Sequence, residues 1–372
     1  MAKILTITDF GASGSGYRSI ASNICKGLSA LGHDIKVLGL EYKGEQHNFD
    51  FGIVPVKDFV EIGRVVTVIT NEWHQDIVLV ILDIPQQIAC LDMFKMPPFK
   101  YFGIMPVESD PLMFPWAMRM MEMDKVFIIS QFGTDEAVKM GVPAEHIRIG
   151  IDTEAWRPPT AEEKSMLRNS FGFDDDTFVV LTVADNQERK NIPRAMEIVS
   201  DLCKKYPDKD IQHIIKTKPR YGIGWDLDDY SRTIGYNKNY RKIDKPLNFM
   251  KLWSYYAVSN VMLHTSKCEG LCIPLLEAMA TGVYPIATNC TAIVELLADE
   301  RGYLIDYTKV EPDYTDPYGN SKRYFAKRSH GLELLEAAML NTPKTNREYV
   351  EGRKWDIAVN QINDAIEILK LS

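Results

Sequence analysis

Apolar and polar positions in the first 40 residues follow the pattern of a strand, a turn, a helix and a second strand. The apolar runs 3–8 and 35–40 have the length of buried strands. Between them, apolar residues recur at helical spacing from Ile20 to Leu31, and the pattern stops at Gly32, a residue type that commonly ends helices. A strand, a helix and a strand in this order predict a βαβ unit and hence a parallel sheet.

The same alternation continues along the chain. In the first half, apolar runs at 76–83, 101–106 and 124–130 predict further strands. A second series of strands and helices starts with TFVVLTVAD (177–185) and extends past the strand-like run YPIAT (284–288). Strands and helices that alternate in both halves predict an α/β protein with two doubly wound domains that face one another across a cleft.

Domain boundaries follow from this series. We expect a Rossmann-like first domain at 1–152 and a Rossmann-like second domain at 153–350, with a pair of prolines at 158 and 159 marking a break near the junction. The final segment 348–372 predicts one long amphipathic helix, of which 351–372 lie beyond the second domain. This helix is expected to pack on the second domain or to cross back to the first, which includes packing across both.

Composition limits the classes of partner. The chain has 372 residues, 45% hydrophobic and 25% charged, as in soluble globular proteins, and it has no apolar run long enough to predict a membrane span. A formal net charge of −8 argues against a nucleic acid as the main partner. Six scattered cysteines without a CxxC pair, and a start without signal-peptide features, predict a cytoplasmic location. Association with a membrane surface stays open.

The glycine-rich turn GASGSG (11–16) follows the first predicted strand. Gly14 and Gly16 would let the backbone approach a phosphate or a sugar closely. A dinucleotide site would need a third glycine where Ser19 stands, although Glu41 stands near the position of the acid that such sites use. A nicotinamide-dependent dehydrogenase is therefore an alternative.

A basic pair lies in VADNQERKN (183–191), after the first strand of the second half. Arg189 and Lys190 could neutralise a diphosphate there, because ligands of such sheets bind at the carboxyl ends of the strands. Exposed residues at a helix start would explain the pair equally well.

The segment SKCEGLCIPLLEAMATG (266–282) places two carboxylates around a helix start. Pro274 suits the first turn of a helix and Gly282 suits its end, so Glu269 would precede the helix and Glu277 would lie one turn inside it. The first backbone N–H groups would form an anion site, and the carboxylates could accept hydrogen bonds from a polyhydroxylated ligand. An ordinary turn between a strand and a helix fits the same residues.

In combination these segments resemble the retaining glycosyltransferases of family 4, which have the two-domain GT-B fold. EGLCIPLLEAMATG (269–282) matches the family's pattern of two glutamates around a glycine and an apolar run. The flanking runs match as well, as do ISQFGTDEAVKMGVPAEHIRIGIDTEAWRP at the junction and NQERKNIPRAMEI. The resemblance covers most of the chain and is weakest at 40–100 and 219–247.

The resemblance implies roles for residues of both halves. It implies that Glu269 contacts donor-sugar hydroxyls, that Glu277 accepts hydrogen bonds from ribose, and that Lys190, with Arg189, meets the leaving diphosphate, where negative charge grows. The further donor contacts that it implies are the glycines Gly14 and Gly16, the helix-start residues Gly270, Leu271 and Cys272, and a base position near Gly235 and Tyr236.

Three departures from the family pattern stand out. Asp185 occupies the usual place of an arginine. We expect it to pair with Arg189, and the alternative is that it points away and hydrogen-bonds a base or ribose. Cys272 replaces a glycine. The histidine that often follows the fourth strand of the first domain is absent, and Glu108 and Asp110 stand there instead, so Glu108 is a catalytic candidate.

We therefore expect a retaining glycosyltransferase, most simply a hexosyltransferase, that uses a nucleotide-diphosphate sugar and an unidentified acceptor: a sugar, a lipid-linked sugar or a small molecule. We expect no cofactor and no metal site, because protein cations can stabilise the leaving group and the nearest DxD-like run, DLDD (226–229), lies in polar residues 219–246, predicted to be one long loop. The alternatives are an epimerase or phosphorylase of the same fold, the dehydrogenase, and a non-catalytic nucleotide-sugar binder.

Overall fold

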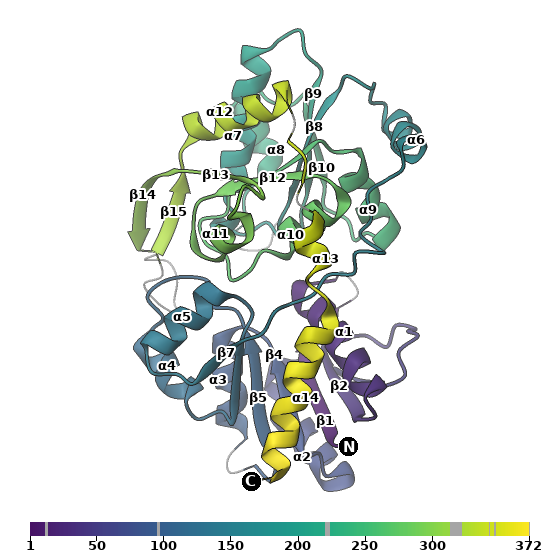
Figure 1. Cartoon of the computed structure of the whole chain (residues 1–372), viewed down its shortest axis with the longest axis vertical. Coiled ribbons are helices and arrows are strands. Elements are labelled where there is room, and N and C mark those ends of the chain that lie inside the picture. The colour runs from purple at the N-terminus through teal and green to yellow at the C-terminus, as the bar shows by residue number, and fades with distance from the viewer. Residues whose placement is uncertain are drawn as a thin grey trace. The chain divides into compact units, whose positions relative to one another are not determined.

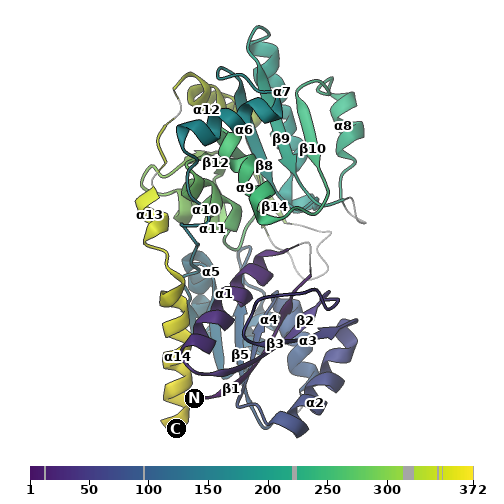
Figure 2. The ribbon, with the colours of Figure 1, turned by 90° about the vertical axis from the view of Figure 1, so that its right-hand side faces the viewer.

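The computed structural model of this protein describes residues 1–11, 14–94, 97–219, 224–312, 322–341, 343–345 and 347–371. By its internal contacts the chain divides into two units: Met1–Gly150 with the segment from Arg353 onward, and the described residues between Ile151 and Gly352. Figure 1 and Figure 2 show each unit as a sheet with helices packed against it. Both units are α/β, which confirms the predicted fold class.

The first unit is built on a seven-stranded sheet in which every neighbouring pair of strands is parallel. In spatial order its strands are β3 (Gly52–Val56), β2 (Asp34–Leu40), β1 (Lys3–Asp9), β4 (Ile77–Ile81), β5 (Lys100–Met105), β6 (Lys125–Ile128) and β7 (Ala144–His146). Its helices are α1 (Gly16–Ala30), α2 (Ile62–Trp73), α3 (Ile84–Met93), α4 (Phe114–Met120), α5 (Gln131–Lys139) and α14 (Trp355–Leu371), with a short 3-10 helix, η1 (Phe59–Glu61). The strand order reverses between β1 and β4.

Local chemistry explains these elements. All five residues of β4 are buried, as expected for a parallel strand covered on both faces. Helix α1 starts after Ser15, whose hydroxyl accepts a hydrogen bond from the backbone N–H of Arg18 at 3.1 Å. The buried face of α1 carries Ile20, Ile24 and Leu28 at the helical spacing that predicts this helix from the sequence.

The second unit is built on a six-stranded parallel sheet. In spatial order its strands are β10 (Tyr240–Ile243), β9 (Ile211–Lys216), β8 (Phe178–Val183), β11 (Val261–His264), β12 (Tyr284–Thr288) and β13 (Tyr303–Ile305); an antiparallel hairpin, β14 (Tyr307–Pro312) and β15 (Lys322–Ala326), forms a separate small sheet. Its helices are α6 (Ala161–Phe171), η2 (Glu188–Lys190), α7 (Ile192–Lys205), α8 (Leu227–Thr233), α9 (Phe249–Val258), α10 (Ile273–Thr281), α11 (Thr291–Leu297), α12 (Arg328–Leu340) and α13 (Arg347–Glu351). Here the order reverses between β8 and β11.

The sequence pattern predicts that the polar region 219–246 is one long loop, and this prediction is wrong. Its described part contains α8, which Asp226 caps by accepting from the N–H of Asp229 at 3.0 Å, and the strand β10. Every residue of β10 is half-buried because β10 pairs on one side only, with β9. An edge strand of this kind tolerates polar side chains, which hides it from a search for apolar runs.

The predicted single terminal helix is divided into α13 and α14. Arg353, between them, is buried, and its Nε donates to the carbonyl oxygen of Ile149 at 3.1 Å. Helix α14 packs on α1 within the first unit, where Val359 lies so close to Gly27 that an added Cβ would be 2.4 Å from it. The prediction that the terminal helix returns to the first domain is thus confirmed for α14, and the predicted helix is interrupted before α14.

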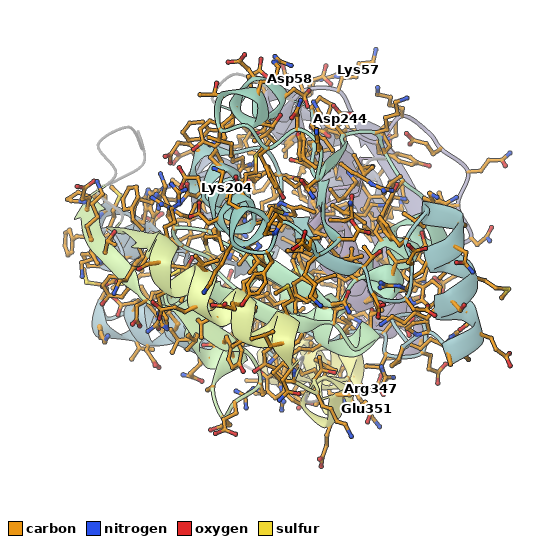
Figure 3. All side chains as sticks on the ribbon, turned by 90° about the horizontal axis from the view of Figure 1, so that it is seen from above. Lys57, Asp58, Lys204, Asp244, Arg347 and Glu351 are labelled. Carbon is orange, nitrogen blue, oxygen red and sulfur yellow. The ribbon has the colours of Figure 1, made fainter. Side chains whose placement is uncertain are left out.

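Helix α13 belongs to the second unit. The Arg347 guanidinium donates to the carbonyl oxygens of Ala280 in α10 and Thr153, the latter at 2.9 Å. Figure 3 shows Arg347 beside Glu351, with which it forms an ion pair of 2.7 Å. These contacts anchor α13 to the helix that carries the candidate site.

Candidate active site

The loops after β8 and β11 meet at the point where the strand order of the second sheet reverses. Ligands of doubly wound sheets bind in the crevice at such a point. The loop after β8 carries Arg189 and Lys190, and the loop after β11 carries Glu269. All residues from Thr265 to Cys272 are buried, so any polar side chain among them needs a partner.

Glu269 is at the centre of this junction and is only 4% exposed. Its carboxylate oxygens accept from the Lys190 ammonium at 2.7 and 2.8 Å and from Nη1 of Arg189 at 3.3 Å. The ring Nε2 of His264, at the end of β11, lies 2.8 Å from Oε1 of Glu269. Since the predicted basic pair and the predicted carboxylate form one ion-paired cluster, the structure brings these three candidates together.

Burial and neighbouring charges shift the pKa of Glu269 in opposite directions. Burial alone would raise the pKa of this carboxyl, but Lys190, Arg189 and the hydrogen bond with His264 together hold it well below its ordinary value. Glu269 is therefore a carboxylate that can accept hydrogen bonds, and its negative charge is already balanced.

The backbone of Glu269 is fixed by Thr291, at the start of α11. The N–H of Glu269 donates to the Thr291 hydroxyl at 2.9 Å, and that hydroxyl donates to the Glu269 carbonyl oxygen at 2.8 Å. Thr291 has a left-handed backbone, with φ of 43°. A β-branched residue in this conformation is strained, and such strain concentrates at functional sites.

Cys272 is the N-cap residue of helix α10, which begins at Ile273; it is buried and has a φ of 74°. This left-handed conformation explains why the resembling proteins carry glycine there, since glycine adopts it without cost. The helix start has no side-chain cap, and Gly270, Leu271 and Cys272 form the approach to it, so its first N–H groups can meet an anion.

Glu277 lies one turn into α10. One carboxyl oxygen accepts from the Tyr256 hydroxyl of α9 at 2.6 Å. Burial raises the pKa of Glu277 to about 7, although the Tyr256 hydrogen bond acts to lower it. Glu277 therefore exchanges its proton near neutral pH, unlike Glu269.

The expected pair between Asp185 and Arg189 does not form. Its carboxylate lies 3.1 Å from the ammonium of Lys218, in the loop after β9, while Arg189 contacts Glu269. The Asp185–Lys218 pair links the ends of β8 and β9, which are neighbours in the sheet although the two residues are far apart in sequence. Asp185 and Lys218 side chains are 42% and 36% exposed, so both remain accessible to a ligand.

Tyr236 lies away from this junction. Its ring is buried in the hydrophobic core of the second unit, beside His213 and Tyr240, and it precedes β10 instead of following it. Tyr236 therefore presents no ring surface to a ligand, and its neighbour Gly235 only closes the turn after α8, with φ of 68°.

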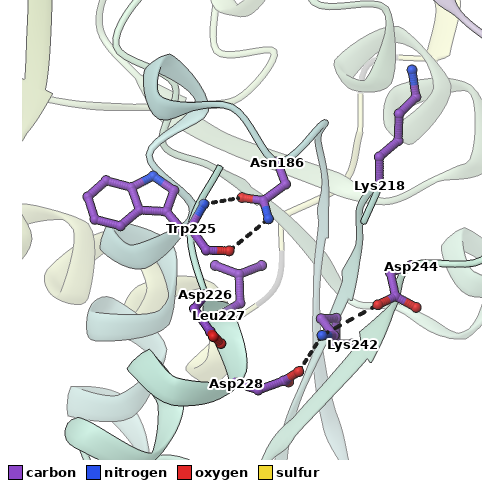
Figure 4. Close-up of a pocket in the computed structure, with 8 residues that line it drawn as sticks. All are labelled: Asn186, Lys218, Trp225, Asp226, Leu227, Asp228, Lys242 and Asp244. Carbon is purple, nitrogen blue, oxygen red and sulfur yellow. Dashed lines mark hydrogen bonds and ion pairs between the residues drawn. The ribbon is translucent and has the colours of Figure 1, made fainter. Parts of the chain in front are cut away.

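A pocket of about 190 Å³ lies instead at the carboxyl ends of β8, β9 and β10 (Figure 4). Within it, the side-chain amide of Asn186 clamps the backbone of Trp225: it accepts from the Trp225 N–H and donates to the Trp225 carbonyl oxygen, both at 2.9 Å. Lys242 contacts Asp228 and lies 3.4 Å from Asp244. The complete lining is Asn186, Lys218, Trp225, Asp226, Leu227, Asp228, Lys242 and Asp244.

The candidates of the first unit lie at its own carboxyl edge. Gly14 has a φ of 72° and precedes α1, which begins at Gly16, directly after β1. The Tyr17 hydroxyl donates to the Asp83 carboxylate, which joins the loops after β1 and β4 where the strand order reverses. Glu108 follows β5 and is half-buried.

Among the described residues, one group could offer three ligands to a metal ion: His264, Glu269 and Cys272, whose ligand atoms lie within 4.8 Å of one another. Two cations already face the Glu269 carboxylate. A divalent ion would have to displace them, so this group suits an ion-paired carboxylate better than a metal.

Several residues of the site are absent from the sequence prediction. His264, Tyr256, Thr291 and Lys218 each contact a predicted site residue from another segment. One signal was available for His264, a polar residue that ends an apolar strand five positions before Glu269. For Lys218, the signal is its place among the lysines and arginines that cluster at 204–245, and for Tyr256 and Thr291 the sequence offers no comparable signal.

Comparisons with known proteins bear on the family and on the fold. Residues 163–312 match the model of the family described as glycosyl transferases group 1. The D-inositol 3-phosphate glycosyltransferase of Corynebacterium urealyticum is 26% identical over 162 residues, which are 42% of this chain and 38% of that relative's length.

Solved structures resemble the whole chain. Sucrose-phosphate synthase from Thermosynechococcus elongatus has a TM-score of 0.78 at 13% identity, with complete coverage of both chains. The Anabaena protein HepE, solved in complex with UDP and glucose, has a TM-score of 0.74 at 14% identity and covers 99% of this chain and 100% of its own. Among the described residues, no helix has both the length and the apolar character needed to cross a membrane, and the six cysteines form no disulfide bond with one another.

Proposed function

We propose that this protein, whose residues 163–312 match the glycosyl transferases group 1 model and whose fold is GT-B, transfers a sugar, most simply a hexose, from a nucleotide-diphosphate sugar to an acceptor with retention of configuration. The observation that carries the proposal is the buried Glu269 carboxylate held by two cations beside an uncapped helix start. An acceptor of hydrogen bonds and a site for an anion are thereby adjacent, as a sugar diphosphate requires.

The cations act on the leaving group. When the bond between the sugar and the diphosphate breaks, both electrons stay with the phosphate oxygen, and negative charge grows there. The Lys190 ammonium, the Arg189 guanidinium and the first N–H groups of α10 supply fixed positive charge at that place. This support favours bond cleavage without a metal ion.

Glu269 serves to hold the sugar. Its carboxylate has a pKa well below the ordinary value and is already paired, so it is a weak nucleophile and a poor general base. It remains a good acceptor for sugar hydroxyls, because an ionised carboxylate has about four lone-pair positions. A sugar held in this way exposes its anomeric carbon to the acceptor.

The nucleoside lies along the same sheet edge. Glu277 offers a carboxyl oxygen to ribose hydroxyls. Lys218, paired with Asp185 at the ends of β9 and β8, is a further cation for the diphosphate.

A thermal-shift screen of UDP-, GDP- and ADP-sugars tests the proposal, because a ligand that binds the folded state raises the melting temperature. Release of the nucleoside diphosphate in the presence of candidate acceptors then reports transfer, and NMR of the product reports its anomeric configuration. An inverted product excludes the retaining mechanism. Donor conversion without an acceptor indicates an epimerase, and binding without turnover indicates a non-catalytic binder.

A further inference from the structure

The hairpin β14–β15 contacts the loop that carries Glu269. The family match ends at residue 312, so β15 lies outside it. The backbone N–H of Tyr324, in β15, donates to the carbonyl oxygen of Lys267 at 2.9 Å. The Lys267 ammonium lies 4.5 Å from the centre of the Phe325 ring, also in β15. The hairpin is thus docked on residues directly before Glu269.

Arg323 makes the closest side-chain contact from this hairpin. It is 8% exposed, and its Nη1 lies 2.8 Å from the Sγ of Cys268, the residue before Glu269. A guanidinium is rarely buried to this degree, because removing it from water is costly unless neighbouring groups compensate. The contact with Cys268 places this guanidinium directly against the residue before Glu269.

The rest of the loop is held from two other sides. On one side, the N–H of Lys267 donates to the carbonyl oxygen of Arg189 at 2.7 Å. On the other, Thr291 fixes the backbone of Glu269. The hairpin closes the third side, so that the position of the Glu269 carboxylate depends on a strand about 55 residues further along the chain.

We propose that the β14–β15 hairpin is a positioning element for the donor sugar, in which Arg323 and the Tyr324 backbone hold the loop 266–269 so that Glu269 faces the sugar hydroxyls. This inference rests on the proposed function. Arg323 acts through Cys268 and Glu269 and does not touch the donor. Its effect should be larger on the sugar than on the nucleotide, because Glu277 is held by Tyr256, whereas Lys190 and Arg189 contact Glu269 and share only part of a displacement of this loop.

Affinities measured by calorimetry test this separation with two pairs of probes, UDP with UDP-glucose and GDP with GDP-mannose. In Arg323→Ala we expect the affinity for the bound nucleotide sugar to fall on the order of tenfold, because small displacements of a positioning group have large effects. The affinity for the matching nucleoside diphosphate should fall by clearly less, because its cations also keep their own chain positions after β8. Equal losses for both, or no loss for either, overturn the proposal.

Two further variants protect the test. Cys268→Ala removes the sulfur that Arg323 contacts, and it replaces Arg323→Ala if that variant does not fold. Glu311→Gln, on the exposed strand β14, alters a pair of 2.8 Å with Lys309 and should change neither affinity. A matching effect in Glu311→Gln would mean that the hairpin acts through its general stability.

Hydrogen exchange separates this inference from the proposed function. The amides of 266–272 should exchange faster in Arg323→Ala than in the wild-type protein, whether or not a ligand is present. If the wild-type protein binds none of the four probes, the proposed donor fails, while the exchange measurement still decides the hairpin's role. Unchanged exchange in this segment overturns the positioning role by itself.

Discussion

The Tyr256 hydroxyl donates a 2.6 Å hydrogen bond to Glu277, so a residue of α9 supports a carboxyl group of α10 whose pKa burial raises to about 7. An acid with a higher pKa in the folded protein than in the unfolded chain binds more protons when folded, between pH 4.5 and about 7. The free energy of unfolding therefore falls as pH rises through this window.

Glu277→Gln should remove this pH dependence. We expect the difference in free energy of unfolding, variant minus wild type, to increase as pH rises from about 4.5 to about 7, by at most about 3 kcal/mol. Urea unfolding at a series of pH values measures the difference. A difference that stays constant across the window would contradict the raised pKa.

The same titration should affect the ligand. Ribose hydroxyls donate best to an ionised carboxylate, so the affinity of the wild-type protein for UDP or GDP should rise as pH increases through about 7. Glu277→Ala should weaken this binding by about 1–3 kcal/mol and remove the step. Calorimetry that finds unchanged nucleotide affinity in a folded variant would remove Glu277 from the donor site.

Lys190→Ala should reduce turnover more than it reduces binding of the nucleoside, because the ammonium meets charge that grows during the reaction. It also leaves Glu269 with less positive charge nearby, so a lower melting temperature is expected. Lys204→Ala, an exposed lysine of α7 labelled in Figure 3, is the matched control. Equal losses for uridine and UDP would count against the assignment.

Asp185→Asn should tighten binding of the diphosphate. The neutral amide no longer competes for Lys218, and a negative charge near the phosphates is removed. Because both side chains are more than a third exposed, we expect only about 0.2–1 kcal/mol. UDP and uridine affinities decide: if both weaken by the same factor, Asp185 binds the nucleoside instead.

Removal of metal ions should leave transfer intact, because Lys190, Arg189 and the α10 start supply the positive charge. Activity is compared before and after treatment with EDTA, with Mg²⁺ or Mn²⁺ added back. A reproducible loss that added metal restores would show that these protein groups are not sufficient.

Much of the fold follows from local patterns. The run IVLVI of β4 is apolar throughout because helices cover both faces, and the glycine at 282 ends α10 with a φ of 86°. The strand β10 is missed, since an edge strand carries polar residues. The break before α14 is missed because it depends on Arg353 bonding to Ile149, about 200 positions away.

The site is predictable where neighbours in sequence act together and not where distant residues meet. Glu269, Lys190 and Arg189 were expected at one sheet edge, and the parallel order of β8 and β11 brings them into contact. The partner of Asp185 was expected four residues away, but it is Lys218 on a neighbouring strand end. Sequence spacing does not reveal which strand ends are adjacent.

The packing of α14 on α1 has a consequence for synthesis on the ribosome. The first 150 residues emerge before the second unit, but the groove at Gly27 is filled by Val359, which is translated after it. In a nascent first unit, the surface of α1 around Gly27 therefore stays uncovered during translation of some two hundred residues. During this interval we expect chaperones that recognise exposed apolar segments to bind at this part of α1. They should be released once Val359 packs against Gly27.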